Sequence, residues 1–450
     1  MKKCRFLPIL MLIFSPSVCI GQSMGQEEKG NEKNQQEEKQ KIDSLEKKVK
    51  ELEEKLSALE KKSLENEINK EVETSEEETA QGTGKFVSGA RALQAQNPEI
   101  SVTGDIVGRL YINDNFRKKA SNETEEEANE HIYSDSSGFD LRILELQFQS
   151  NLDPYSFFKT NLGVHGGHFH VCEAYVTWTG LIPRFNLTLG KFRQQFGVIN
   201  RWHEHALDQV DSPKSLELFF GDEGLSQIGI SMKILLPRLW AHANELTIEI
   251  TNAENSSLFA GEFWSVPSIL GHLKNYYDLS KSTYMEIGLS GLWGFNNKRG
   301  FSIFNEETQE NETRNEPWRS TVVAGFDLNL SWVPPQMSKY RGFTWRTEGM
   351  YLWKETEEGI IKALSGFSYI DYRINQVFIL GVRVDGGQKP VIGDDREFVQ
   401  ASPYLTIWPS EWVFLRLQYN YLWERGTKEP QHLVMLQVDF SAGPHKHDKY

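Results

Sequence analysis

Residues 190–211, which read GKFRQQFGVINRWHEHALDQVD, gather side chains that bind metals or transfer protons in many proteins. Two histidines, the glutamate between them and two aspartates supply this chemistry: His203, Glu204, His205, Asp208 and Asp211. Imidazole nitrogens and carboxylate oxygens are common ligands of transition metals. The helical zinc-protease motif places its histidines four residues apart, and Leu207 stands where the second one would be. The segment therefore predicts no zinc-protease site.

A second pair of histidines lies upstream in HGGHFHVCE, where His168 and His170 alternate and Cys172 continues the same phase. Alternate residues of an extended segment share one face. His168 with His170, and His203 with His205, are therefore two candidate pairs for metal binding. The spacing fixes no third or fourth ligand, and it therefore predicts no metal site by itself. No G-x-S-x-G, P-loop or dinucleotide fingerprint occurs in the chain. We expect neither a cofactor nor enzymatic activity.

The N-terminal residues 1–21 read as a secretory signal peptide, with a basic start, an apolar run and small residues before Gln22. Cleavage would leave Cys172 as the sole cysteine, so no intramolecular disulfide is expected. The formal net charge of −14 argues against non-specific nucleic-acid binding. Residues 22–41 are polar and too poor in apolar side chains to order themselves, which predicts a flexible segment.

Residues 42–62 repeat apolar side chains at heptad positions a and d, which predicts a parallel α-helical coiled coil. Its core consists of Ile42, Leu45, Val49, Leu52, Leu56 and Leu59. Glutamates at position e and lysines at g can pair between chains. A solvated single helix is the alternative, although it would leave the apolar seam uncovered. Residues 63–98 are acidic and predict a flexible tether.

Residues 99–450 change to a period of 2, which indicates β-strands. The strand candidates begin near residues 100, 140, 156, 170, 184, 226, 243, 272, 283, 318, 342, 361, 376, 396, 411 and 431. In VVAGFDLNLSW, apolar side chains alternate with Asp327, Asn329 and Ser331, and tryptophans gather near strand ends. Apolar-out, polar-in alternation with aromatic rims favours a transmembrane barrel over a soluble β-sandwich. The fold class is therefore all-β, a 16-stranded antiparallel barrel preceded by the coiled coil.

The connections between these strands alternate between short turns, several marked by proline, and long polar segments. The long segments are 113–138, 197–225, 252–271 and 296–317. Tight periplasmic turns and long external loops are typical of outer-membrane barrels. An even strand number also puts both ends of the barrel on the periplasmic side, which predicts that the coiled coil lies in the periplasm.

EAYVTW at 173–178, followed by LTLGKFRQQFG at 187–197, resembles the phosphate-selective porin O/P type of trimeric Gram-negative outer-membrane porin. The longer run through FFGDEGLSQIGI is nearer an uncharacterised porin-like branch often labelled zinc-regulated outer-membrane receptor. The resemblance implies a passive channel, a homotrimer, and a connection 197–225 that folds inward and narrows the lumen. The mixed charges of the lumen side lack the single-sign field that phosphate selectivity requires, so that property is not carried over.

Residues expected to line or constrict the pore combine the polar face of the strands with the connection 197–225. They are Glu145, Glu173, Arg193, Arg201, His203, Glu204, His205, Asp208, Asp211, Asp327, Arg346, Glu348, Arg383, Asp385, Arg416 and Asp439. Acids outnumber cations within the connection, which favours cations or neutral solutes by simple electrostatics.

The leading functional hypothesis is a porin for passive diffusion of small hydrophilic solutes or ions, embedded in outer-membrane lipid. One alternative is a channel for uptake of metals or metal chelates, prompted by the histidine pairs. Another is an envelope tether, in which the barrel anchors a coiled coil that contacts peptidoglycan or a periplasmic partner.

Overall fold

The computed structural model describes residues 98–112, 137–165, 168–261, 266–305, 310–392 and 396–443. The chain divides into the units Met1–Val87 and Ser88–Tyr450, and every described residue belongs to the second. The predicted signal peptide, polar segment, coiled coil and most of the tether lie outside the described residues. No helix within the described ranges has the length and apolar content needed to span a bilayer.

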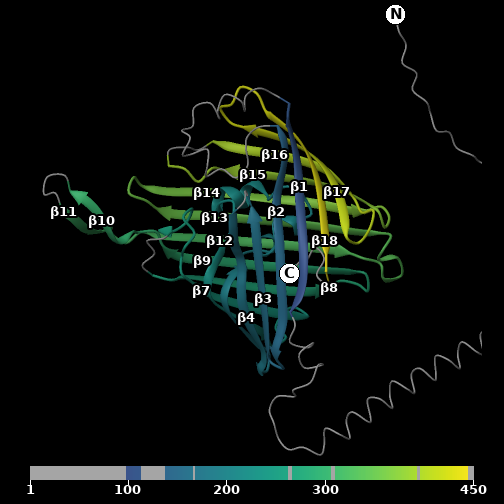
Figure 1. The fold of residues 1–450 in the computed structure, drawn as a ribbon, viewed down its shortest axis with the longest axis horizontal. Helices are drawn as coiled ribbons and strands as arrows, with labels where there is room; N and C mark the ends of the chain where they lie inside the picture. Colours follow the sequence, from purple (N-terminus) through teal and green to yellow (C-terminus); the bar gives the residue numbers. More distant parts are fainter. Residues whose placement is uncertain are drawn as a thin grey trace, which may run out of the picture. The chain divides into compact units, whose positions relative to one another are not determined.

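Sixteen antiparallel strands close into one barrel, as predicted (Figure 1). They are β1 (Glu99–Tyr111), β2 (Gly138–Asp153), β3 (Ser156–His165), β4 (His168–Ile182), β5 (Phe185–Arg193), β6 (Ser226–Leu236), β7 (Ala243–Thr251), β8 (Ser268–Asp278), β9 (Thr283–Phe295), β12 (Ser320–Trp332), β13 (Gly342–Glu355), β14 (Ile360–Arg373), β15 (Phe378–Gln388), β16 (Glu397–Ile407), β17 (Val413–Glu424) and β18 (Gln431–Ala442). Each strand begins within a few residues of its predicted start. The barrel closes where β1 pairs with β18, from Val102↔Ala442 to Tyr111↔Leu433.

The two faces of each strand differ in polarity because successive side chains point to opposite sides of a sheet. On β12, Asp327 and Asn329 are buried in the interior, whereas Phe326 is 43% exposed on the outer face. The same alternation on β14 exposes 61% of Leu364 and buries Ser365. On these strands the polar side chains therefore face the interior and apolar ones the outside, as the sequence pattern predicted, although the interior also holds some large apolar side chains such as Phe367.

Strand order assigns each connection to one end of the barrel. One end holds short turns, including the 3₁₀ turn η4 (Pro335–Met337) between β12 and β13. The other end holds the longer connections, although 166–167 and 356–359 are short exceptions there. We call these the short-turn end and the long-connection end. The start of β1 and the end of β18 are both at the short-turn end, as an even strand number requires.

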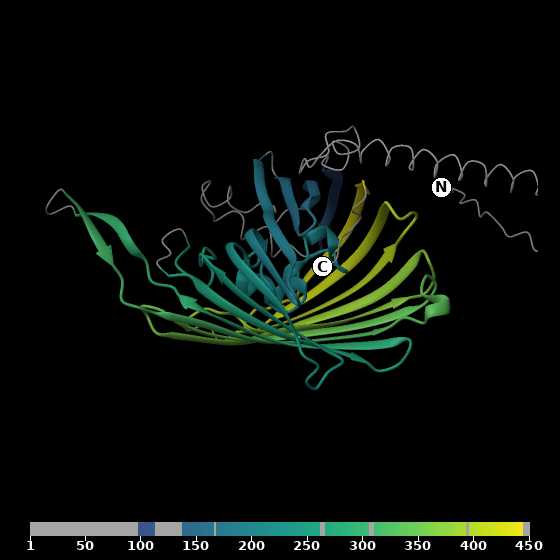
Figure 2. The same ribbon diagram turned by 90° about the horizontal axis from the view of Figure 1, so that it is seen from below.

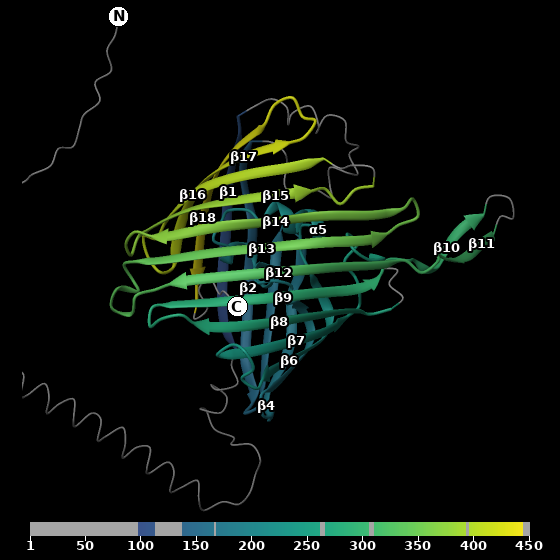
Figure 3. The ribbon, with the colours of Figure 1, turned by 180° about the vertical axis from the view of Figure 1, so that it is seen from behind.

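A separate hairpin interrupts the connection between β9 and β12. It consists of β10 (Arg299–Asn305) and β11 (Glu310–Asn315), which pair only with each other. Figures 1 and 3 show this hairpin standing away from the barrel wall. The sequence predicted only a long loop here, because ENETRN has no apolar alternation that would mark a strand.

The strands β1–β4 lie across the interior from β12–β14 (Figures 1 and 2). Residues 194–225, between β5 and β6, occupy this interior, and we call them the inward segment. It contains η1 (Ile199–Arg201), η2 (Glu204–Ala206) and the helix α5 (Lys214–Phe220). The helix packs against β14 and β15. The inward course of this connection, which the family resemblance implied, is therefore confirmed.

Candidate functional site: the inward segment and the barrel lumen

The two ends of the inward segment are joined by hydrogen bonds. The backbone N–H of Gln194 donates to the carbonyl oxygen of Leu225 at 2.8 Å. The buried side-chain amide of Asn200 donates to the carbonyl oxygens of Gln194, at 2.8 Å, and Leu225, at 3.2 Å. The amide oxygen of Asn200 accepts from the N–H of Leu225 at 2.9 Å. We call this hydrogen-bonded closure the neck. It lies directly next to the register pair Arg193↔Ser226, at which the pairing of β5 with β6 ends.

Beyond the neck, backbone N–H groups of the segment donate to acids of the wall. Glu348 Oε1 on β13 accepts from the N–H groups of Val198 and Ile199, both at 2.9 Å. The N–H of Gln195 donates to Glu249 on β7 at 3.0 Å. Gly197 has φ +60°, and its N–H donates to a hydroxyl of β9. Buried carboxylates thus find donors in the segment, which satisfies groups that would otherwise be costly to bury.

His203 connects the segment to the opposite wall. Its Nδ1 lies 3.0 Å from Glu145 Oε2 on β2, and its Nε2 lies 3.0 Å from Glu173 Oε2 on β4. Burial alone would lower the pKa of His203, but these two carboxylates raise it to about 9. The imidazolium therefore fastens the segment to β2 and β4 at neutral pH. Burial lowers the pKa of the neighbouring His205, which favours its neutral form.

Three acids of the segment are paired with arginines of the wall: Glu204 with Arg142 at 3.5 Å, Asp208 with Arg346 at 3.3 Å, and Asp211 with Arg383 at 2.9 Å. Partial burial alone would raise the pKa of Asp211, but Arg383 and the amides of Gln418 and Asn420 lower it. Each of these three acids therefore has an arginine partner, and Arg142 and Arg383 are shared with Asp105 and Asp385 of the wall. A simple preference for cations no longer follows from the acidic excess counted in the sequence.

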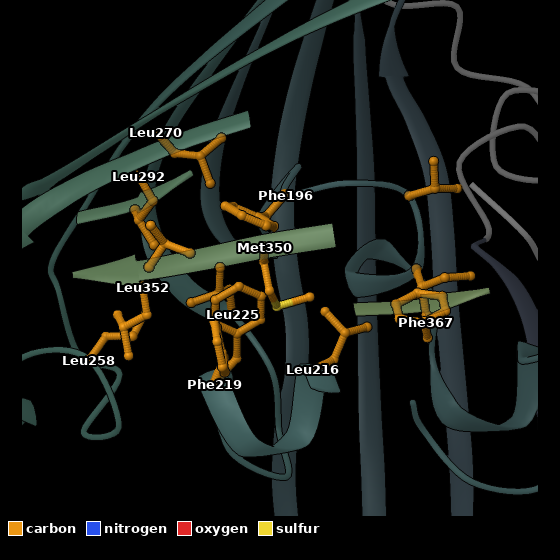
Figure 4. Packing of buried hydrophobic residues seen from close by; sticks show 14 of the residues in the cluster. Phe196, Leu216, Phe219, Leu225, Leu258, Leu270, Leu292, Met350, Leu352 and Phe367 are labelled. Carbon is orange, nitrogen blue, oxygen red and sulfur yellow. The ribbon is translucent and has the colours of Figure 1, made fainter. Parts of the chain in front are cut away.

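An apolar cluster holds the remaining side of the segment against the wall (Figure 4). Phe196, Leu216 and Phe219 pack with Met350 of β13 and Phe367 of β14. The connection between β7 and β8 contributes further apolar side chains to the same cluster. The sequence patterns did not predict this apolar anchor. The sequence feature that could have indicated it is the number of large apolar residues in the connection 197–225, which was classed as polar.

Two cavities lie on opposite faces of residues 204–214. A cavity of about 270 Å³ at the long-connection end is lined by Arg142, Glu204, Asp211 and Lys214, among others. A cavity of about 380 Å³ at the short-turn end is lined in part by His205, Asp208, Arg346, Arg373 and Arg416. Each cavity mixes positive and negative side chains.

Most of the other predicted lumen residues also lie on the inward face. Arg193 is the exception, because it shares the outer face of β5 with Leu189 and Lys191, whereas the buried Phe192 between them faces inward. Arg383 contacts Asp385 at 2.7 Å, and Arg193 donates to the carbonyl oxygen of Glu223. Arg416 donates to Thr406, Gln437 and the backbone of Gln209. The remaining predicted positions are side chains that are buried or half-buried within the barrel: Arg201, Asp327 and Asp439.

The candidate histidines are divided between two elements. His168 and His170 lie on β4 near its long-connection end, whereas His203 and His205 lie on the inward segment. In the part of the chain that the structure describes, no three His, Cys, Asp or Glu side chains are already placed to hold one metal ion.

No protein-family model matches the chain. It is 28% identical to an uncharacterized protein of Aquifex aeolicus over 236 residues, which are 50% of this chain and 47% of that protein. The chain thus spans about half the length of the curated relative it matches.

Solved structures of similar fold include OprB of Pseudomonas putida at high pH, with 9% identity, a TM-score of 0.49, and coverage of 80% of this chain and 99% of that one. The outer membrane channel DcaP of Acinetobacter baumannii has 11% identity, a TM-score of 0.47, and coverage of 77% and 96%. The anion-selective porin from Comamonas acidovorans has 11% identity, a TM-score of 0.47, and coverage of 77% and 100%. All three scores lie below 0.5, and none assigns a function to this chain.

Proposed function

We propose that this chain is an outer-membrane channel through which small hydrophilic solutes or ions diffuse passively. The observation that carries the proposal is the distribution of polarity in the barrel. Arg383 and Asp327 have no solvent exposure inside it, whereas Leu364 and Phe326 are exposed outside. Soluble proteins rarely expose contiguous apolar surface of such extent, and a bilayer would cover it.

The interior supports diffusion of hydrophilic solutes. The two cavities open toward opposite ends of the barrel, and polar and charged side chains line both. The pairing of Asp208 and Asp211 with arginines leaves no strong field of one sign at the segment between the cavities. Ion selectivity arises from such single-sign rings or fields. We therefore propose weak ion preference rather than phosphate selectivity, and no catalytic role.

The proposal also covers export of the chain, the place of the coiled coil and the assembly of the barrel. The N-terminal signal peptide directs export, the predicted coiled coil of residues 42–62 lies in the periplasm, and the barrel assembles as a homotrimer. The short-turn end then faces the periplasm, because the chain enters the barrel there at β1. The coiled coil either supports trimer assembly or contacts peptidoglycan.

The test is recording from planar bilayers containing the purified, refolded chain under a KCl gradient. We expect stepwise conductance and a reversal potential close to zero. Protein that has formed the barrel, as shown by its heat-dependent gel migration, but leaves the bilayer electrically silent would contradict the proposal. A large reversal potential would contradict only its weak ion preference. Trimer formation is checked by light scattering of the detergent complex, with and without residues 42–62.

A further inference from the structure

The cavity at the short-turn end has more positive than negative side chains. Three arginines and two aspartates line it: Arg346, Arg373, Arg416, Asp208 and Asp371. Asp208 pairs with Arg346 at 3.3 Å, and Asp371 accepts a hydrogen bond from Tyr404. The pKa of His205, which also lines the cavity, is lowered by burial, so this side chain adds no charge. The lining therefore carries one excess positive charge.

Arg416 is only 3% exposed, yet its hydrogen-bond acceptors are all neutral. Its Nε donates to Thr406 Oγ1 at 2.9 Å. Its Nη1 donates to the carbonyl oxygen of Gln209 and to Gln437 Oε1, both at 2.8 Å. Among the described residues, Nη2 has no acceptor and Arg416 forms no ion pair. Because a buried cation without a counter-charge is costly, an anion in the cavity would supply what the wall lacks.

Arg373 lies on the same register row of the inner face as Arg416. Arg373 of β14 pairs with Ile379 of β15, which pairs with Thr406 of β16. Thr406 in turn pairs with Arg416 of β17, so the two arginines are three strand spacings, or about 14 Å, apart at their Cα atoms. The bond from Arg416 to Thr406 shows that its side chain leans toward β14. Arg373 makes no hydrogen bond or ion pair with any described residue, so its guanidinium is available from the other side.

Aromatic side chains line the cavity beside this row. Phe414 precedes Arg416 by two positions on β17, so both side chains lie on the inner face, and Phe414 is 1% exposed. The ring centroid of Trp408, which follows β16 directly, lies 4.9 Å from that of Phe414. Both rings are on the short-turn side of the row, because β16 ends and β17 begins there. The cavity thus combines uncompensated positive charge with an apolar surface.

We propose that this cavity binds a small organic monocarboxylate with an apolar body, which rests on the proposed channel function and names a class of solute for it. The carboxylate lies between Arg373 and Arg416, because guanidinium groups donate paired hydrogen bonds to carboxylate oxygens. The apolar body packs against Trp408 and Phe414. One negative charge balances the one excess positive charge of the lining. Inorganic phosphate matches neither that single charge nor the apolar surface.

A carboxylate site at the short-turn end is compatible with a weak ion preference of the whole channel. The cavity at the long-connection end is lined by four acids and three cations, so its excess charge is negative. The two cavities therefore carry excess charges of opposite sign. A carboxylate is held at one level of the lumen and is not attracted along its whole length.

The test is calorimetric titration of the full-length chain, purified in detergent at neutral pH, with sodium benzoate. We expect one benzoate per chain. Acetate lacks the apolar body, benzamide lacks the charge, and phosphate lacks the match to both, so each should bind at least about 10-fold more weakly. Arg373→Gln and Arg416→Gln should each weaken benzoate binding at least about 10-fold, because each removes charge-assisted hydrogen bonds.

The matched control is Arg238→Gln, which should leave benzoate affinity unchanged. Arg238 is exposed in the turn between β6 and β7 at the same end and does not line the cavity. Absence of benzoate binding, equal affinity in Arg373→Gln and the control, or phosphate binding as tight as that of benzoate would overturn the proposal. If Arg416→Gln fails to form the barrel, Arg373→Gln decides the question alone. A silent bilayer would reject the channel function and leave the calorimetric result standing, whereas a conducting channel that binds no benzoate would reject only the carboxylate site.

Discussion

Asp211 of the inward segment and Arg383 of β15 form an ion pair of 2.9 Å whose guanidinium is completely shielded from solvent. Arg383 also donates to the backbone carbonyl of Asp211 at 2.7 Å and contacts Asp385. The pair ties the middle of the segment to the wall. Removal of the Asp211 carboxylate would leave Arg383 with Asp385 as its remaining acid.

We expect Asp211→Ala to lower the free energy of unfolding by about 1–2 kcal/mol, since several charge-assisted hydrogen bonds are lost from a carboxylate that is partly exposed. The segment should also separate from β15–β17, which would raise single-channel conductance. Denaturant unfolding in detergent and bilayer recording measure the two effects. Asp222→Ala is the control, because Asp222 is exposed on the same segment. Equal effects of both substitutions would show that the pair is unimportant.

The Asp211 carboxylate should also make the attachment of the inward segment depend on pH. The pKa of Asp211 is lowered in the folded chain, so its stabilising contribution is present above the unfolded-state pKa of about 3.9 and is lost as pH falls through the lower folded value. Acidification below about pH 4 should therefore loosen the segment. Proteolysis of the segment by pepsin between pH 5 and pH 2 reports this step. Asp211→Ala should have a smaller acid-induced increase in cleavage than the native chain, and identical profiles would refute the assignment.

Gly197 is placed where a side chain cannot be accommodated. Its φ of +60° disfavours other residues, and a Cβ would lie 2.2 Å from Glu348 Oε2. Gly197→Ala should lower the free energy of unfolding by about 2 kcal/mol or more, because it adds backbone strain and displaces the acceptor of two hydrogen bonds. Gly349→Ala is the matched control, since a Cβ there meets nothing within 4 Å. Chemical denaturation compares them, and similar losses would contradict the prediction.

The apolar cluster should contribute most to anchoring the segment. Phe219 is 1% exposed within it, and Phe219→Ala should cost about 3–5 kcal/mol through lost burial and a remaining cavity. The expected readouts are a lower denaturation midpoint and noisier single-channel current. Leu364→Ala removes an outward-facing side chain of β14 and should cost clearly less. A small effect at Phe219 would mean that the polar contacts alone hold the segment.

The sequence predicted the barrel well because a period of 2 is a local property that each strand shows by itself. Phe326 and Asp327 are adjacent on β12, and their difference in polarity indicates that they lie on opposite faces of the strand. The hairpin β10–β11 was missed because its second strand carries no such alternation. Consecutive strands of the barrel pair with each other, so the order of the predicted strands along the chain also predicted which strands pair.

The candidate site could be predicted only in part. The sequence identified His203 as a candidate lumen residue, but its partners Glu145 and Glu173 lie on separate strands and are brought near it only by the path of the inward segment. Spacing does not determine that path. For the same reason, the excess of acids in the segment suggested a cation preference, whereas the folded chain sets Asp208 against Arg346.

The closed neck at Gln194, Asn200 and Leu225 makes the inward segment a separable insertion. Its two ends are already within hydrogen-bond distance, and β5 and β6 are in register immediately below them. A two-residue turn could therefore replace everything between the ends without shifting either strand. A change confined to this one stretch of chain can thus alter the contents of the lumen, while the wall keeps its strand number and its register.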